Sequence, residues 1–203
     1  VKNVLKPKLN FIINKISPIF NNYLIYLIVL LNFIFKWHNI ENFPYGLEGD
    51  EITWSVSSLL TKYSIPPSSV GVWSLIENLA KTFPVSIFLN QLSFYLFGYS
   101  LFSPRKMLVL ISSLSLIFFY LFLQKFISKK AALLTVFWYS FSAYFLATSS
   151  IPLQHGFNAA VLMPALLFLA EIKTNLEKNN LKKTIFYSFL SSLFILLSLF
   201  TYN

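Results

Sequence analysis

Cysteine is absent from the 203 residues, and charged residues are scarce. Without a thiol, the chain can form neither a disulfide nor a thiolate metal site. Asp, Glu, Lys and Arg together make up 11% of the sequence, whereas a soluble domain carries about 25%. Because so few charges cannot cover a water-facing surface, the composition predicts a membrane protein.

Glycine is also rare, with five in the whole chain. Phosphate-binding loops, dinucleotide-binding turns and the glycine-flanked serine of many hydrolases all need glycine, and none of these motifs is present. The paired histidines of zinc proteases are missing too, since His38 and His155 stand far apart. The sequence therefore carries none of these common catalytic signatures.

Hydrophobic residues make up 56% of the sequence, and the formal net charge is +9. A basic chain could bind nucleic acid, but here the lysines fall between apolar runs. Anionic lipid headgroups and the bias of lysine towards the cytoplasmic side explain this pattern better. We therefore expect membrane lipids as partners, and no nucleic acid.

Long uncharged runs predict an all-α membrane protein with five spans. The first run, 16–35, has twenty residues without a charge, enough to cross about 30 Å of hydrocarbon. Lys36, Trp37 and His38 then form an interfacial belt. The predicted spans are 16–37, 107–124, 131–148, 157–171 and 184–203, and an outer loop region over 38–106 separates the first two.

The uncharged stretch 82–104 could be a further span, but we interpret it as an amphipathic helix lying in the interface. Its apolar residues form one stripe, while its polar residues lie elsewhere on the helix, as expected at an interface. Counting it as a crossing would also move Lys125 and its neighbours to the outer side. The stripe comprises Val85, Phe88, Leu89, Leu92 and Leu96, and the polar residues are Ser86, Asn90 and Ser93.

The two ends suggest that residues 1–203 are the N-terminal part of a larger transmembrane domain. The sequence begins with Val1 and stops at Asn203 directly after an apolar run. The basic leader and first run resemble a signal peptide, but the run is too long and no small-residue cleavage site follows. A retained first helix is the better interpretation.

The placement of the lysines predicts how the chain is oriented in the membrane. Eleven of the 16 Lys and Arg residues lie in the leader, after the second span and after the fourth span. The positive-inside rule then places the N-terminus in the cytoplasm, in a plasma or inner membrane. The region 38–106 and the turn around His155 fall on the outer side.

The densest cluster of acids, Glu48, Asp50 and Glu51, lies in the outer loop region. Two interpretations stay open. Asp50 precedes apolar residues at helical spacing, so the Asp50–Glu51 pair could cap a helix, worth about 0.5–2 kcal/mol. Alternatively, Asp50 could take a proton from an acceptor hydroxyl as a general base, with Glu51 orienting it or sharing a divalent cation.

Three basic residues on the outer side are candidate substrate-binding residues. Arg105, at the head of the second span, could clamp a phosphate or could simply reach out to water from a helix end. Lys81 could bind substrate or pair with Glu77, four residues earlier. His155 could contact substrate or be an ordinary polar turn residue.

The order of these features resembles glycosyltransferase family 39, a branch of the GT-C superfamily that includes protein O-mannosyltransferases and aminoarabinose transferases. A basic leader and first span precede Gly-Leu-Glu-Gly-Asp50-Glu51. An outer amphipathic region follows, and after it come Leu-Phe-Gly-Tyr-Ser over 96–100 and Arg105. A cluster of lysines ends the second span. The resemblance covers nearly all of this chain but only the N-terminal part of a family member.

The resemblance implies a GT-C-like helical bundle. It also implies transfer of a sugar from a polyprenyl-phosphate donor to a protein, lipid or glycan acceptor on the outer face, with inversion at the anomeric carbon. Asp50 matches the family's base, Glu51 completes the pair, and Arg105 matches an arginine after the Phe-Gly-x-Ser stretch. No cofactor is implied with certainty, although a divalent metal ion could bind at Asp50 and Glu51. We expect the isolated chain to be inactive, because further helices would complete the donor cavity.

The sequence departs from the family pattern at two places. Lys81 is followed by Thr-Phe-Pro, where members often have a basic residue and two prolines. Ser149, Ser150 and Gln154 stand where members often carry Ser-Arg and an acid. The missing charge pair implies a different donor or acceptor, or weaker activity.

Two other functions remain as alternatives. The first is a multi-span transporter or flippase subunit for lipid-linked sugars, although such proteins tend to place acids inside their spans and the predicted span interiors hold none. The second is a non-catalytic membrane scaffold, which would tolerate Asp50→Asn.

Overall fold

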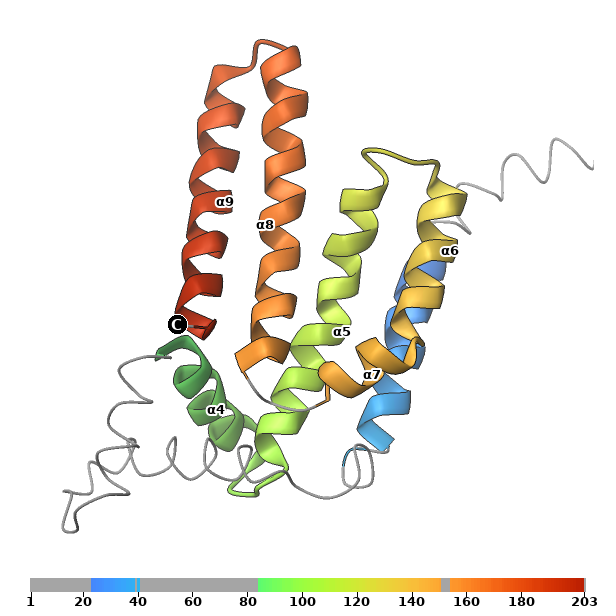
Figure 1. Cartoon of the computed structure of the whole chain (residues 1–203), viewed down its shortest axis with the longest axis vertical. Helices are drawn as coiled ribbons and strands as arrows, with labels where there is room; N and C mark the ends of the chain where they lie inside the picture. Colours follow the sequence, from blue (N-terminus) through green and yellow to red (C-terminus); the bar gives the residue numbers. More distant parts are fainter. Residues whose placement is uncertain (1–22, 39, 41–83, 151–153, 203) are drawn as a thin grey trace, which may run out of the picture.

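A computed structural model describes residues 23–38, 40, 84–150 and 154–202. This part of the chain is helical and contains no strand, which confirms the predicted all-α fold (Figure 1). A helix over Tyr23–His38 comes first and carries no label in Figure 1. The labelled helices are α4 (Pro84–Phe97), α5 (Ser103–Leu123), α6 (Lys129–Ser140), α7 (Ala143–Thr148), α8 (Gln154–Glu177) and α9 (Leu181–Tyr202).

Three helices in the described ranges are long and apolar enough to cross a membrane: Ser103–Leu123, Gly156–Glu177 and Leu181–Phe200. They correspond to the predicted second, fourth and fifth spans. The helix Tyr23–His38 is shorter, and the predicted start of the first span lies outside the described residues. These lengths and compositions make the chain a multi-helix membrane protein.

The helices alternate in direction between two ends of the molecule, which we name the upper and lower ends as drawn in Figure 1. Helices α5 and α8 run upward, whereas α6 and α9 run downward (Figure 1). The α5–α6 and α8–α9 connections therefore both lie at the upper end, and these are two of the lysine-rich loops. The start of α5, the end of α7 and the start of α8 lie towards the lower end.

The predicted span 131–148 is divided into two helices. Helix α6 ends at Ser140 and α7 begins at Ala143. Ser142 stabilises the break, because its hydroxyl accepts a hydrogen bond from the Phe145 backbone N–H (3.2 Å) and donates to the Tyr139 carbonyl (2.8 Å). A serine at this N-cap position satisfies free N–H groups at the start of the new helix.

Helix α8 extends past its predicted end at residue 171, so the loop before α9 is short. The helix continues to Glu177, and Asn179 then adopts a left-handed conformation with φ 52°. The backbone N–H of Asn180 returns to the Asn175 carbonyl (2.9 Å). Asparagine tolerates this conformation better than most residues, and such a turn ends a helix.

Helix α4 is amphipathic, as predicted, but its polar face is turned towards the protein. The side chains of Ser86, Asn90 and Ser93 are buried, whereas Phe88 and Tyr95 are exposed. Water would favour the reverse arrangement. In lipid, apolar side chains can face outward and polar groups gather between helices, so this arrangement favours a membrane environment for α4.

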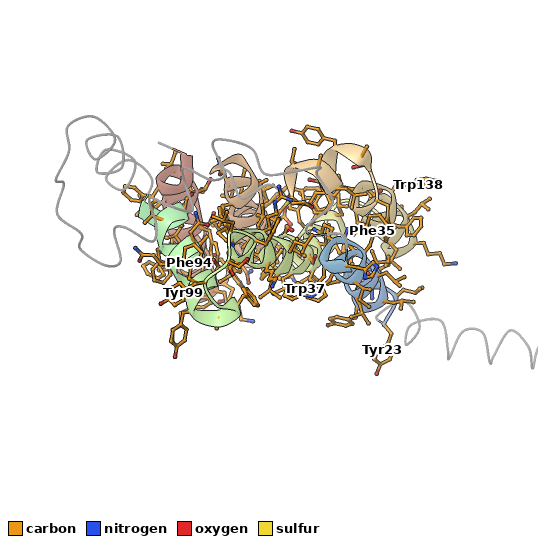
Figure 2. The ribbon with its side chains drawn as sticks, turned by 90° about the horizontal axis from the view of Figure 1, so that it is seen from below. Tyr23, Phe35, Trp37, Phe94, Tyr99 and Trp138 are labelled. Atoms are coloured by element: carbon orange, nitrogen blue, oxygen red, sulfur yellow. The ribbon has the colours of Figure 1, made fainter. Side chains whose placement is uncertain are left out.

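Two apolar clusters fill the space between the helices. The larger joins the first helix to α5, α6 and α7, and the smaller joins α5 to α8. Large hydrophobic side chains also face outward: Tyr23 and Trp138 are each 67% exposed and lie at the edge of the molecule when it is viewed from below (Figure 2). The larger cluster includes Ile25, Ile28, Val29, Leu116, Ala132, Val136 and Phe145.

Candidate functional site

A polar cluster lies near the lower end of the bundle and is centred on Lys36. The Lys36 ammonium nitrogen donates hydrogen bonds to Ser112 Oγ (2.8 Å) and Ser149 Oγ (3.1 Å). It also lies 4.8 Å from the centre of the Phe145 ring, within the range of a cation–π interaction. The first helix, α5 and the end of α7 thus converge on one cation.

Lys36 is buried, with 3% of its surface exposed, rather than part of the interfacial belt predicted from the sequence. The adjacent Trp37 and His38 are not buried, so only the lysine turns inward. One signal could have predicted this placement. Lys36 follows Asn32, another polar residue, by four positions, and on a helix such residues share a face.

Asn32 forms a second set of contacts one turn along the same helix. Its carboxamide nitrogen donates to the Ser140 carbonyl (2.6 Å), and its carboxamide oxygen accepts from Ser113 Oγ (3.1 Å). All three residues are buried. The first helix, α5 and the end of α6 are therefore joined by hydrogen bonds, which fixes the helix that carries Lys36.

A cavity of about 80 Å³ lies beside the Lys36 cluster. Ser112, Phe145 and Ser149, the three partners of Lys36, all line it. This volume is enough for at least two or three water molecules. The remaining lining residues come from α5, α6, α7 and α8 and include four with hydroxyl groups: Ser115, Tyr139, Tyr144 and Thr148.

The described residues provide no carboxylate near Lys36. The acids among them are Glu171 and Glu177, which lie in the last turns of α8, towards the upper end (Figure 1). A charged lysine inside a membrane bundle is costly and often marks a functional site. The Lys36 cluster is therefore a candidate site that the sequence analysis missed.

Arg105 forms a separate contact at the start of α5. Its side chain is fully buried and donates a hydrogen bond from Nη1 to the Ile40 carbonyl (3.0 Å). The guanidinium also lies 5.7 Å from the Phe102 ring centre. Arg105 thus points into the protein and does not reach out to water, while its role as a phosphate clamp stays a prediction.

The structure describes less of the other predicted site residues. Asp50, Glu51 and Lys81 lie outside the described residues. His155 belongs to the first turn of α8 at the lower end, and its side chain is not described. Within the described ranges, no group of three metal-binding side chains occurs, so the metal site at Asp50 and Glu51 also stays a prediction.

The fold and this cluster define a class: an all-α, multi-helix membrane protein with a buried polar cluster near one end of its helices. Comparisons with protein-family models, curated proteins and solved structures give no match for this chain. The resemblance to glycosyltransferase family 39 therefore depends on the sequence motifs alone.

Proposed function

We propose that the chain is part of a membrane glycosyltransferase that moves a sugar from a polyprenyl-phosphate donor to an acceptor. The order of the sequence motifs supports this proposal. The structural observation that best supports it is the hydrogen bond from Arg105 to the Ile40 carbonyl. In the sequence, Ile40 precedes the segment that carries Asp50 and Glu51, so the predicted phosphate-binding arginine contacts the last described residue before that segment.

In this proposal, Asp50 is the general base of an inverting transfer. An acceptor hydroxyl attacks the anomeric carbon, and Asp50 takes its proton. The bond between the anomeric carbon and the phosphate oxygen breaks, and polyprenyl phosphate leaves with the electron pair. Glu51 orients Asp50 or shares a divalent cation with it.

The proposed side of the reaction is the lower end of the bundle. Two lysine-rich loops lie together at the upper end (Figure 1), which by the positive-inside rule is the cytoplasmic end. The lower end then faces the non-cytoplasmic side of a plasma or inner membrane, and the N-terminus lies in the cytoplasm.

The test is sugar transfer by the full-length protein carrying Asp50→Asn. We expect transfer from a radiolabelled polyprenyl-phosphate sugar to fall by roughly 10²–10⁴-fold, with membrane insertion unchanged. Glu177→Gln is the matched control, because it removes an exposed acid from the last turn of α8 and should leave the rate unchanged. Turnover retained by the Asp50 variant would remove Asp50 from the base role.

Buried Lys36 favours one alternative, a transporter or flippase for lipid-linked sugars, because charges inside membrane bundles often mark transport pathways. Liposomes distinguish the two functions. A flippase moves a labelled lipid-linked sugar between leaflets without an acceptor, whereas a transferase consumes the donor only when an acceptor is present.

A further inference from the structure

We propose that the cavity beside Lys36 binds a phosphate group, with Lys36 as the source of positive charge. The site is distinct from the predicted acids and from Arg105. It depends on three observations: a buried cation without a carboxylate partner among the described residues, two buried serines that contact it, and a small cavity that shares those serines.

Taking an ammonium group out of water is expensive unless an opposite charge compensates it. Ser112 and Ser149 supply oxygen atoms to Lys36, and Phe145 supplies a ring face, but all three are neutral. A bound anion supplies the missing charge, and in surroundings of low polarity its attraction to Lys36 is strong.

Lys36 does not itself line the cavity, but its ammonium nitrogen contacts Ser112 Oγ (2.8 Å) and Ser149 Oγ (3.1 Å), and both serines line it. An anion in the cavity would therefore contact serines that Lys36 also contacts. Ser115 and Thr148 also line the cavity. Their hydroxyls donate to the Ser112 carbonyl (2.7 Å) and the Tyr144 carbonyl (2.9 Å), so they can donate to an oxyanion only by turning away from those carbonyls.

A cavity volume of about 80 Å³ is enough for the five heavy atoms of a phosphate group. Tyr144 forms part of the wall and is 75% exposed, so the wall extends from the buried cluster to the outside of the bundle. A phosphate could therefore arrive on a lipid or as a free ion.

The experiment measures equilibrium binding to the full chain in nanodiscs of uncharged lipid. The probes are a radiolabelled polyprenyl phosphate, the matching polyprenol without phosphate, and inorganic phosphate. The choice of the polyprenyl probe rests on the proposed function, whereas the site itself rests on the residues around Lys36. We expect polyprenyl phosphate to bind at least ~10-fold more tightly than polyprenol, as a buried charge contact allows.

Lys36→Met is the main variant, because methionine keeps much of the side-chain length and removes the charge. We expect this variant to lose the preference for polyprenyl phosphate over polyprenol, so that the ratio of the two affinities falls about 10-fold or more. Lys106→Met is the matched control, since Lys106 also lies at the lower end but is stacked over Trp37 (5.8 Å) and does not contact the cluster. The control should bind within about 2-fold of the original chain.

If inorganic phosphate binds with the same dependence on Lys36, the site is supported and the source is free phosphate. Equal binding of polyprenyl phosphate and polyprenol, with no binding of inorganic phosphate, overturns the proposal. Unchanged binding in Lys36→Met, or an equal loss in Lys106→Met, also overturns it. Should Lys36→Met fail to fold, Ser149→Ala replaces it, with a loss of several-fold expected and unchanged binding counting against the site.

This site and the proposed transfer reaction can fail separately. Asp50→Asn should abolish transfer but leave the Lys36-dependent binding of phosphate intact. A chain that binds phosphate through Lys36 but shows no transfer retains the site and loses the transferase function. A chain that transfers sugar with full rate in Lys36→Met, and binds phosphate equally well, retains the function and loses the site.

Discussion

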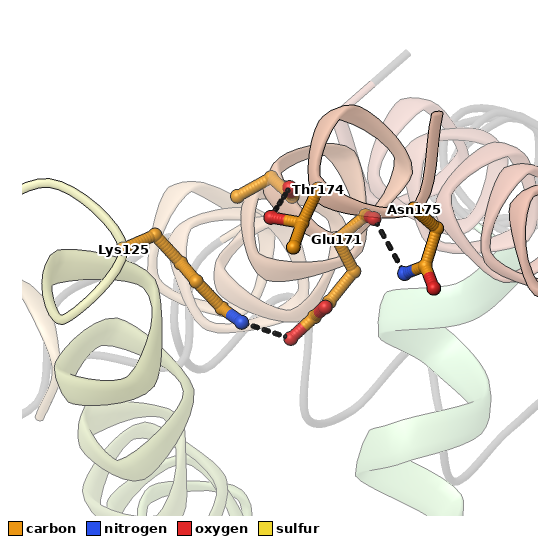
Figure 3. A network of polar contacts seen from close by, with 5 residues as sticks. Lys125, Glu171, Thr174 and Asn175 are labelled. Carbon is orange, nitrogen blue, oxygen red and sulfur yellow. Dashed lines mark hydrogen bonds and ion pairs between the residues drawn. The ribbon is translucent and has the colours of Figure 1, made fainter. Parts of the chain in front are cut away.

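Lys125 and Glu171 join the upper ends of α5 and α8, with Lys125 Nζ 2.5 Å from Glu171 Oε1 (Figure 3). The side chains are 31% and 23% exposed, respectively. Asn175 Nδ2 donates to the Glu171 backbone carbonyl (2.8 Å) within the same turn of α8. One lysine of the upper end therefore pairs with protein and is not left to lipid headgroups alone.

We expect this ion pair to contribute less than about 1 kcal/mol to the free energy of unfolding, because partly exposed pairs are screened by solvent. A double-mutant cycle with Lys125→Met and Glu171→Gln isolates the coupling between the two charges. Reversible unfolding in mixed micelles gives the free energies. A coupling well above 1 kcal/mol would show that the pair is shielded from water more than its exposure indicates.

The hydrogen bonds of Asn32 should contribute more to the free energy of unfolding than the Lys125–Glu171 ion pair does. Asn32→Leu keeps the side-chain volume but leaves the Ser140 carbonyl, at the end of α6, without its side-chain donor. We expect a loss of about 1–2 kcal/mol in unfolding free energy, measured in the same micelles. Thr135→Val is the control, because the exposed Thr135 hydroxyl bonds only within its own helix (2.9 Å to the Ala131 carbonyl). Equal losses in the two variants would contradict a special role for Asn32.

Replacing Arg105 should loosen the contact between the start of α5 and the end of the first helix. Arg105→Met removes the donor to the Ile40 carbonyl, and a hydrogen bond from a charged group contributes about 1.5–3 kcal/mol. We expect a loss of that size in thermal or micellar unfolding. Lys106→Met, which removes only a cation stacked over Trp37, should cost less than ~1 kcal/mol. Comparable losses would mean that burial of Arg105 contributes little.

The sequence predicted the fold class and most of the helices because both depend on local signals. Long uncharged runs underlie α5, α8 and α9, and such runs can be recognised without knowing which helices pack against them. The division between α6 and α7 depends on Ser142, and a serine capping a break looks the same in sequence as a serine inside a span. Whether such a serine caps a break or lies inside a continuous helix depends on the backbone around it.

The Lys36 cluster could not be predicted for a different reason. Lys36 lies at the end of an apolar run, where lysine normally reaches towards water, and its serine partners are 76 and 113 positions away. The direction of its side chain depends on how three helices pack. The inward polar face of α4 is a similar case, because periodicity finds the two faces but does not tell which one meets the protein.

The arrangement of the loops gives a topology that chemical labelling can test, and the absence of cysteine makes each introduced thiol the sole target. Ser128 and Asn180 lie in the two upper-end connections, and Leu101 lies in the lower-end connection between α4 and α5 (Figure 1). We expect Leu101→Cys and Asp50→Cys to react with a membrane-impermeant maleimide on intact cells. Ser128→Cys and Asn180→Cys should react only after permeabilisation, because the positive-inside rule places their lysine-rich loops in the cytoplasm.

The possible labelling outcomes test the helix arrangement, the membrane orientation and the proposed function separately. Reaction of Ser128→Cys and Asn180→Cys on opposite sides would contradict the helix order seen in Figure 1. Reaction of both from outside, with Leu101→Cys protected, would keep the fold and reverse its orientation. Asp50 would then face the cytoplasm, and a transferase acting on the outer face would be excluded. Labelling of Asp50→Cys together with Leu101→Cys from outside is therefore the result that the proposed function requires.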